Sequence, residues 1–400
     1  MSGFYKKVIS ALLICVMLIV GAWVVSRDTW TSVQTDPLAD QENAQREAQE
    51  AAHEAYEQAE PDLVMWYEDA TYTPFFELAV EQYYAKTGVK VVVECRESLD
   101  YMGDIYDQTM QDDVFPDLYL ISGDNLEEMY LYGLVSQNVE GLEGSGVVPN
   151  AVTASTYGDM LLGYPLSFHT CVFIFQTDYF GERPASLQAI VDYSDENEPE
   201  ENVEFLLEWD VNDSYYDFPF VSNSVTFEKS ETGVLNVRYD EELYQKDLEY
   251  FEKILGSFSV DTKRVSEQGI IDNFLAGRTL SAIVDTDFLW QLDGYSYALM
   301  RMPDLNEELA ANTCAGTDML VVNDFSPETE IAADFAHFAT VDLAESLYPL
   351  TGHFSVIPSK EPTWVEQVAH EAYAGAVLMP DSQDARDFWV ELEETILKYF

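Results

Sequence analysis

Residues 63–95 read LVMWYEDATYTPFFELAVEQYYAKTGVKVVVEC and carry the signals of a strand, a helix and a second strand. The run LVMWY is apolar and β-prone, and Thr73-Pro74 then supplies a helix N-cap and a first-turn proline. One face of the helix is apolar, with Phe76, Ala79, Val80 and Tyr83, and Gly88 is suited to end it. VKVVVEC is the next strand. This order predicts two parallel strands joined by a crossover helix.

The same alternation continues along the chain. A polar helix is expected around Leu99–Gln111, and LYLI (118–121) is the third strand. Strands alternating with helices predict an α/β fold with a mainly parallel sheet. Ligands of such sheets bind beyond the carboxyl ends of the strands, here at Glu68–Tyr72 and Ser122–Asn125. The second half has further strands and helices, and residues 224–240 have a hairpin pattern.

The N-terminus is predicted to be a membrane anchor. Val8–Val25 is an apolar run of 18 residues, or about 27 Å as a helix. Lys6 and Lys7 precede it and no basic excess follows, so the N-terminus is expected in the cytoplasm. Residues 28–60 are polar and acidic, without a wide apolar stripe, and are expected to be a partly helical tether.

Two alternatives to an uncleaved anchor follow from the same segment. A secretory signal peptide is the closer one, because Val24 and Ser26 are small enough for a cleavage site. A lipoprotein signal fits less well, since Ile14 stands where a small residue should precede Cys15. All three options place the rest of the chain outside the cytoplasm.

The composition excludes some partners. The chain has 19 basic and 74 acidic side chains, a net charge of −55, so its surface repels phosphate backbones and nucleic-acid binding is not expected. The four cysteines form no CxxC pair and give no zinc spacing. For Cys171 and Cys314 two buried thiols are expected, and a disulfide between them is the alternative.

Four stretches together resemble the extracellular solute-binding proteins of bacterial ABC importers, in the class that includes maltose- and other sugar-binding proteins. The first is 63–95, the family's opening strand, helix and strand. The others are FPDLYLISGDNLEEMYLYGLVSQN (115–138), YGDMLLGYPLSFHTCVFIFQTDYF (157–180), and SAIVDTDFLW (281–290) with YALMRMP (297–303) and TGHFSVIPSK (351–360). Their order and spacing carry the resemblance.

The resemblance implies a two-lobed, periplasmic-binding-protein-like α/β fold in which each lobe is a mainly parallel sheet flanked by helices. The expected parts are an anchor or signal helix (1–27), a tether (28–60), lobe I (61–168 plus about 312–345) and lobe II (about 172–305 plus 346–400). It also implies a monomer at the extracytoplasmic face of the membrane, which captures a sugar or oligosaccharide between its lobes and passes it to ABC permease subunits. No cofactor or metal is expected.

Carried over residue by residue, the resemblance implies a set of ligand-binding positions. Two loops contribute Asp69, Thr71 and Tyr72, and Ser122, Asp124 and Asn125, with Asp124 at a sugar-binding aspartate position. Later candidates are His169, Asp287, Phe288, Trp290, His353 and Phe354. His169 departs from the family, which often has a carboxylate there, and one of Phe288 and Trp290 is expected to pack inward. Capping the following helix is the alternative role for Asp124.

The sequence is also compatible with other functions. The carboxylates Asp124, Asp285 and Asp287 with nearby aromatic residues favour a polyamine or other cationic ligand as the main alternative. A sensing or scaffold protein on the same fold is the alternative from another class. An enzyme is not expected, because no HExxH, GxSxG or P-loop motif occurs and acidic pairs are inevitable among 74 carboxylates.

Overall fold

The computed structural model describes residues 60–111, 115–180, 183–197, 201–229, 235–258, 266–379 and 382–399. The first unit forms as predicted: β1 (Leu63–Tyr67) and β2 (Val91–Cys95) are parallel partners joined by α3 (Thr73–Thr87). Gly88 ends α3 in the left-handed region at φ 75°. The N-cap prediction is wrong, because Thr73 is the first helical residue and its hydroxyl lies 2.9 Å from the Tyr67 hydroxyl.

Most strands belong to one mixed sheet with the order β10-β6-β11-β3-β1-β2. β3 (Leu118–Ser122) is parallel to β1, but β11 (Cys314–Val322) is antiparallel to both β3 and β6 (Tyr164–Phe175). β9 (Ser281–Asp285) and β10 (Ala298–Met300) are antiparallel to β6 as well. The prediction of a mainly parallel sheet therefore holds for β1–β3 and is wrong for the strands that pair with β6.

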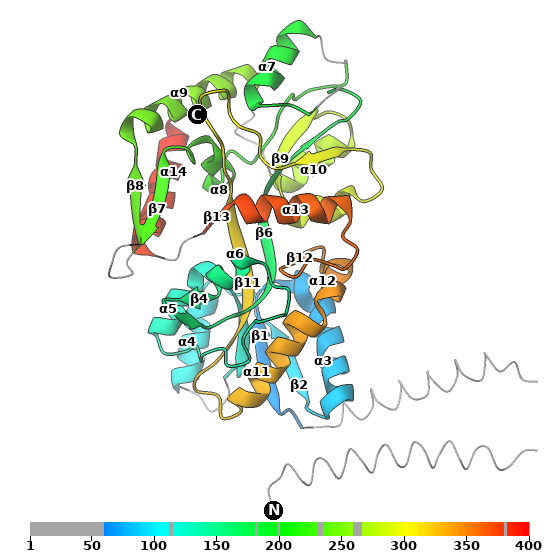
Figure 1. The fold of residues 1–400 in the computed structure, drawn as a ribbon, viewed down its shortest axis with the longest axis vertical. Helices are drawn as coiled ribbons and strands as arrows, with labels where there is room; N and C mark the ends of the chain where they lie inside the picture. Colours follow the sequence, from blue (N-terminus) through cyan, green and yellow to red (C-terminus); the bar gives the residue numbers. More distant parts are fainter. Residues whose placement is uncertain are drawn as a thin grey trace, which may run out of the picture.

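Figure 1 shows two lobes joined by β6 and β11, which run from one into the other. Lobe I, around β1–β3, also contains α4 (Tyr101–Gln111), η2 (Gly123–Asn125), α5 (Leu126–Leu131), α6 (Pro149–Ala154), β4 (Thr156–Tyr157), β5 (Met160–Leu161), α11 (Thr329–His337) and η5 (Phe338–Asp342). Lobe II, around β9 and β10, contains α7 (Leu187–Glu196), α8 (Ser214–Asp217), η3 (Phe218–Phe220), the hairpin β7 (Val225–Lys229) and β8 (Leu235–Tyr239), α9 (Glu241–Phe258), α10 (Glu267–Leu275), η4 (Thr286–Leu292), β13 (Val377–Leu378), α14 (Gln383–Ile396) and η6 (Leu397–Tyr399).

Each lobe has its own hydrophobic core. In lobe I one cluster lies between the sheet and α3 and α11, and a second packs Trp66 against Ile105 and Met129. In lobe II a large cluster surrounds Trp209, and another packs β6 and β9 against α13 (Trp364–Gly375). Separate cores joined by two strands leave the polar groups near the crossing to face one another.

One predicted boundary differs from the structure. The sequence-based division places residues from 346 onward in lobe II, but α12 (Ala344–Thr351) packs on α3, and its Leu347 is buried in the core with Phe75. The chain returns to lobe II only after β12 (Phe354–Ser355), which pairs with β6. The other lobe boundaries stay predictions.

Within the part of the chain that the structure describes, no helix is both long and apolar enough to cross a membrane. The predicted anchor at 1–27 and almost all of the tether at 28–60 lie outside the described residues.

Candidate functional site

Two loops at the carboxyl ends of β1 and β3 carry the first candidate residues. The short helix η1 (Ala70–Tyr72) follows β1, and Asp69 caps it by accepting a hydrogen bond of 2.8 Å from the Thr71 backbone N–H. After β3, η2 carries Asp124, whose Oδ1 accepts a hydrogen bond of 3.2 Å from Asn125. Neither η2 nor α5 has a side-chain cap, so the alternative role of Asp124 as a helix cap is wrong.

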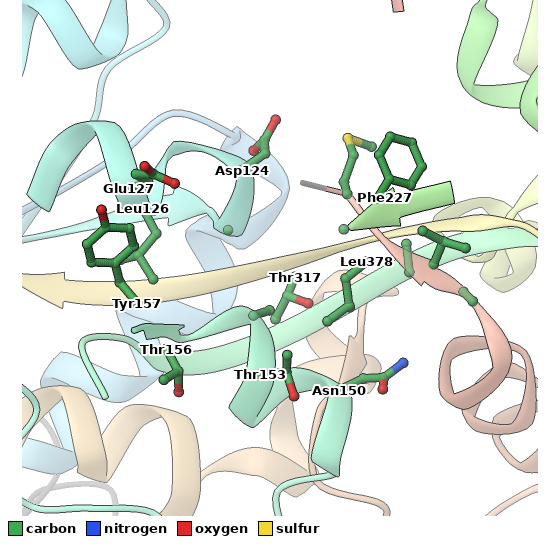
Figure 2. A pocket seen from close by; sticks show the side chains of 17 residues that line it. Asp124, Leu126, Glu127, Asn150, Thr153, Thr156, Tyr157, Phe227, Thr317 and Leu378 are labelled. Atoms are coloured by element: carbon green, nitrogen blue, oxygen red, sulfur yellow. The ribbon is translucent and has the colours of Figure 1, made fainter. Parts of the chain in front are cut away.

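A pocket of about 420 Å³ lies beside η2, between the lobes. Figure 2 shows Asp124 at one side of the pocket and Phe227, from β7 of lobe II, at the other, with Thr317 of β11 below both in this view. The remaining lining residues come from both lobes and are Gly123, Leu126, Glu127, Asn150, Thr153, Ala154, Thr156, Tyr157, Ala315, Gly316 and Ala376–Met379. Of the sequence-predicted site residues, only Asp124 lines this pocket.

The groups that could bind a ligand here are two carboxylates and two rings. Asn150, Thr153 and Thr317 already form hydrogen bonds to Tyr373, Pro149 and Tyr373, respectively. Asp124 and Glu127 have the largest acceptor capacity in the lining, since an ionised carboxylate accepts about four hydrogen bonds. Tyr157 and Phe227 add aromatic surface.

A second polar group lies where lobe II meets the η1 loop. We call it the lobe-interface cluster, and it consists of Thr71, Tyr72, Ser167, His169, Tyr215, Asp285, Asp287, Asp318 and His353. The Tyr72 hydroxyl donates to Asp318 at 2.6 Å and lies 2.6 Å from the Ser167 hydroxyl. Burial, with the charge of Asp318 next, raises the pKa of Tyr72 well above its usual value, so Tyr72 remains a neutral donor.

His169, which is partly exposed, and the buried Asp285 form an ion pair in this cluster. His169 Nδ1 lies 3.1 Å from Asp285 Oδ2, and the Tyr215 hydroxyl donates to the same oxygen at 2.6 Å. Burial alone would lower the pKa of His169, but the charge and hydrogen bond of Asp285, together with the charges of Asp287 and Asp318, raise that pKa to about 10. Burial would raise the pKa of Asp285, yet His169 and Tyr215 bring it below its usual value. His169 is therefore positively charged, and the carboxylate of Asp285 is its counter-ion.

His353 links the η1 loop of lobe I to η4 of lobe II. Its Nε2 lies 2.7 Å from Thr71 Oγ1, its Nδ1 lies 3.0 Å from Asp287 Oδ1, and its ring stacks on Tyr72 at 4.4 Å. Burial would lower the pKa of His353, but the charge and hydrogen bond of Asp287, together with the charges of Asp318 and Asp69, raise it above its usual value. The structure thus brings Thr71, Tyr72 and Asp287 together around one buried histidine.

The aromatic candidates differ in their burial. Phe288 packs against the lobe II core and Trp290 is 52% exposed, which confirms that one of the two packs inward. Phe354 is only 2% exposed and stacks between Phe168 and Tyr348, so its ring is a core group and not a ligand platform. Ser122 and Asn125 are partly buried beside Asp124 but do not line the pocket.

β11 connects the pocket with the lobe-interface cluster. Gly316 lines the pocket, and on its other side the ring of His169 occupies the space that a side chain would need, with Cδ2 only 2.7 Å from an added Cβ. A larger residue at position 316 must push the His169 ring away from Asp285 or separate β11 from β6.

We therefore expect Gly316→Ala to lower the free energy of unfolding by about 1–3 kcal/mol, measured by urea unfolding. Gly256→Ala is the control, because Gly256 lies in α9 with no atom within 4 Å of an added Cβ, and alanine favours a helix. In a His169→Ala background the cost of Gly316→Ala should shrink, since the overlapping ring is gone. An equal cost in both backgrounds would contradict the packing argument.

Sequence reasoning missed several residues of the site. Tyr157 and Phe227 line the pocket, and Tyr215, Ser167 and Asp318 belong to the lobe-interface cluster. The hairpin containing Phe227 is predicted, but nothing in its pattern points to the pocket. Among the described residues no group of three or more His, Cys, Asp or Glu side chains could hold a metal ion.

Comparison with known proteins adds a family and a fold. The model of the family of bacterial extracellular solute-binding proteins matches residues 78–361. The extracellular solute-binding protein from Staphylococcus aureus in complex with maltose is similar at 17% identity and a TM-score of 0.69, covering 86% of this chain and 93% of that one. A cyclo/maltodextrin-binding protein complexed with maltotetraose is similar at 18% identity and a TM-score of 0.72, with the same coverage. No curated protein sequence matches the chain.

Proposed function

Because this chain belongs to the family of bacterial extracellular solute-binding proteins, we propose that it captures a sugar or oligosaccharide between its two lobes and delivers it to an ABC permease. The single observation that carries the sugar assignment is the composition of the pocket beside η2. There, two carboxylates and two aromatic rings come together from both lobes. The proposed function requires no cofactor and no turnover of the ligand.

The chemistry of the pocket suits a polyhydroxylated ligand. An ionised Asp124 can accept hydrogen bonds from two adjacent hydroxyls, and Glu127 can do the same one turn away. Rings such as Tyr157 and Phe227 cover the apolar face of a sugar and lose little rotamer entropy. The solved structures with the same fold that hold maltose or maltotetraose support this ligand class.

Delivery requires that the permease can distinguish loaded from empty protein. Phe227 and Leu378 come from lobe II, whereas Asp124 and Tyr157 come from lobe I, so a ligand in the pocket contacts both lobes. A ligand that contacts both lobes favours the closed arrangement by the contacts that exist only there. We propose that the permease subunits bind this closed form, and that the segment 1–27 holds the protein at the membrane.

We expect an oligosaccharide to stabilise the purified full-length protein in thermal unfolding. A panel of mono- and oligosaccharides, polyamines and amino acids identifies the ligand, because a compound at 100 times its Kd adds about 2.7 kcal/mol to the free energy of unfolding. The bound sugar should be recovered unchanged after overnight incubation. Stabilisation by no sugar, or appearance of a cleaved product, would contradict the proposal.

A cationic ligand is the second candidate, favoured by the carboxylates of Asp69, Asp285, Asp287 and Asp318 near the lobe interface. His169 and His353 already pair with Asp285 and Asp287, which leaves less negative charge for a cation. Titrations at about 50 and 500 mM salt separate the two, because the affinity for a polyamine falls with salt and that for a neutral sugar does not.

A further inference from the structure

Two cysteines that the proposed function does not use lie on the two crossing strands. Cys171 is in β6, and Cys314 is the first residue of β11. The antiparallel register pairs Gly316 with His169 and Ala315 with Thr170. One residue further along the two strands, the same register places Cys314 opposite Cys171. The Thr170 hydroxyl donates a hydrogen bond of 2.7 Å to the Cys314 carbonyl and fixes the strands to each other at this point.

Both thiols point into the same core. Directly opposed residues of an antiparallel pair extend to the same face of the sheet, and Cys171 and Cys314 both belong to the lobe II cluster around Trp209 with 0% exposure. Opposed Cα atoms lie about 4.5 or 5.5 Å apart, depending on the type of pair. Both separations fall in the disulfide range of about 4.4–6.8 Å. The backbone is therefore placed for a bridge.

We propose that Cys171 and Cys314 are a redox pair that closes to a disulfide across the two crossing strands. In this structure both thiols are free, which is the reduced form of the pair. The proposal rests on the extracytoplasmic location of the family and not on the identity of the ligand. Disulfides form and persist in that compartment, whereas they are rare in the cytosol.

Closure needs an oxidant, and an organic disulfide such as oxidised glutathione is sufficient. One cysteine thiolate attacks the oxidant and releases one glutathione thiol, which leaves a mixed disulfide. The second cysteine then attacks that protein sulfur and releases the second glutathione. Two protein thiols thus lose two electrons and two protons, the S–S bond forms, and the oxidant is reduced to two thiols.

Burial determines when this step occurs. It raises the pKa of both thiols well above the usual value, so few thiolates exist in the folded protein. Closure therefore takes place while the lobe II core is open, during folding after export or in mild denaturant. Once closed, the bridge fixes β6 to β11 at the lobe II end of the crossing.

The test is a thiol map of the full-length protein. The purified protein is held with oxidised glutathione in urea below its unfolding midpoint, quenched with N-ethylmaleimide, and digested at acidic residues, since the chain has only 19 Lys and Arg. Mass spectrometry should find a linked peptide pair containing Cys171 and Cys314. Alkylation at both should fall at least about tenfold and return with dithiothreitol. The exposed Cys95 should carry a single glutathione.

Two results would overturn the proposal. One is that Cys171 and Cys314 stay alkylatable after denaturation, and the other is that each carries its own glutathione, which would mean that they cannot meet. A second measurement compares melting temperatures before and after oxidation, where closing a long loop should raise Tm by about 5 °C or more in Cys95→Ser. The variant with both Cys171→Ser and Cys314→Ser should show no rise, and an equal rise there would also contradict the bridge.

Discussion

Replacing His169 by glutamine is expected to lower the free energy of unfolding by about 2–4 kcal/mol at pH 6. The reason is Asp285, which is only 5% exposed and accepts hydrogen bonds from His169 and Tyr215 on one oxygen. Without the imidazolium, the buried carboxylate of Asp285 keeps the hydrogen bond from the Tyr215 hydroxyl but loses its positively charged partner. Glutamine can still donate a hydrogen bond, so the measurement isolates the charge.

The effect should depend on pH in a defined direction. The pKa of His169 is raised to about 10 in the folded protein, above the ordinary value of about 6.5. The stability from this raised pKa is fully present below about pH 6.5 and is lost as the pH rises through about 10. Asp285 has a lowered pKa, so its share is present above about pH 4 and is lost in more acidic solution. The difference between wild type and His169→Gln should be largest between about pH 4 and 6.5.

Urea unfolding of both proteins at pH 5, 7.5 and 10 measures this difference. His337→Gln is the matched control, because His337 lies on α11 and takes no part in the lobe-interface cluster. It should change the free energy of unfolding by no more than about 0.5 kcal/mol at each pH. A difference for His169→Gln that is independent of pH would show that packing, and not the ion pair, stabilises this part of the interface.

Asp124→Asn is expected to weaken binding of the sugar identified in the panel by about 10- to 100-fold. Asparagine keeps the shape of the side chain but replaces one acceptor oxygen by an NH₂ group and removes the charge. A hydrogen bond to a charged group contributes about 1.5–3 kcal/mol, which corresponds to this loss of affinity. Isothermal titration of wild type and variant gives the ratio directly.

Asp107→Asn is the control for this substitution. Asp107 is an exposed carboxylate of α4 in the same lobe and does not line the pocket. It should leave the affinity unchanged within about twofold, and neither variant should change Tm without ligand by more than about 2 °C. Equal affinities for wild type and Asp124→Asn would place the ligand outside this pocket, while the panel result would still stand.

Some of the site could be predicted from the sequence because its signals are local. Asp69, Thr71 and Tyr72 follow an apolar strand and precede a proline-started helix, so strand-end reasoning places them at the edge of the sheet. Asp124 follows β3 in the same way, and it does line the pocket. His353 came from the resemblance, and the structure places it against Thr71 and Asp287.

Other members of the site have no local signal. Tyr72 and Asp318 share a hydrogen bond across 246 residues, and His169 and Asp285 across 116. Phe227 reaches the pocket only because the β7–β8 hairpin of lobe II faces η2 of lobe I. The local sequence pattern around these residues does not indicate which distant segment each of them contacts.

The opening strand, helix and strand and the acidic surface could be predicted from the amino-acid sequence, since periodicity, turn residues and charge act within a few residues of each position. The antiparallel direction of β6 and β11, the ion pair of His169 with Asp285 and the placement of Cys171 opposite Cys314 follow from long-range contacts in the folded protein. A buried strand has the same apolar pattern in either direction, and its register is set by the partners that the folded sheet provides.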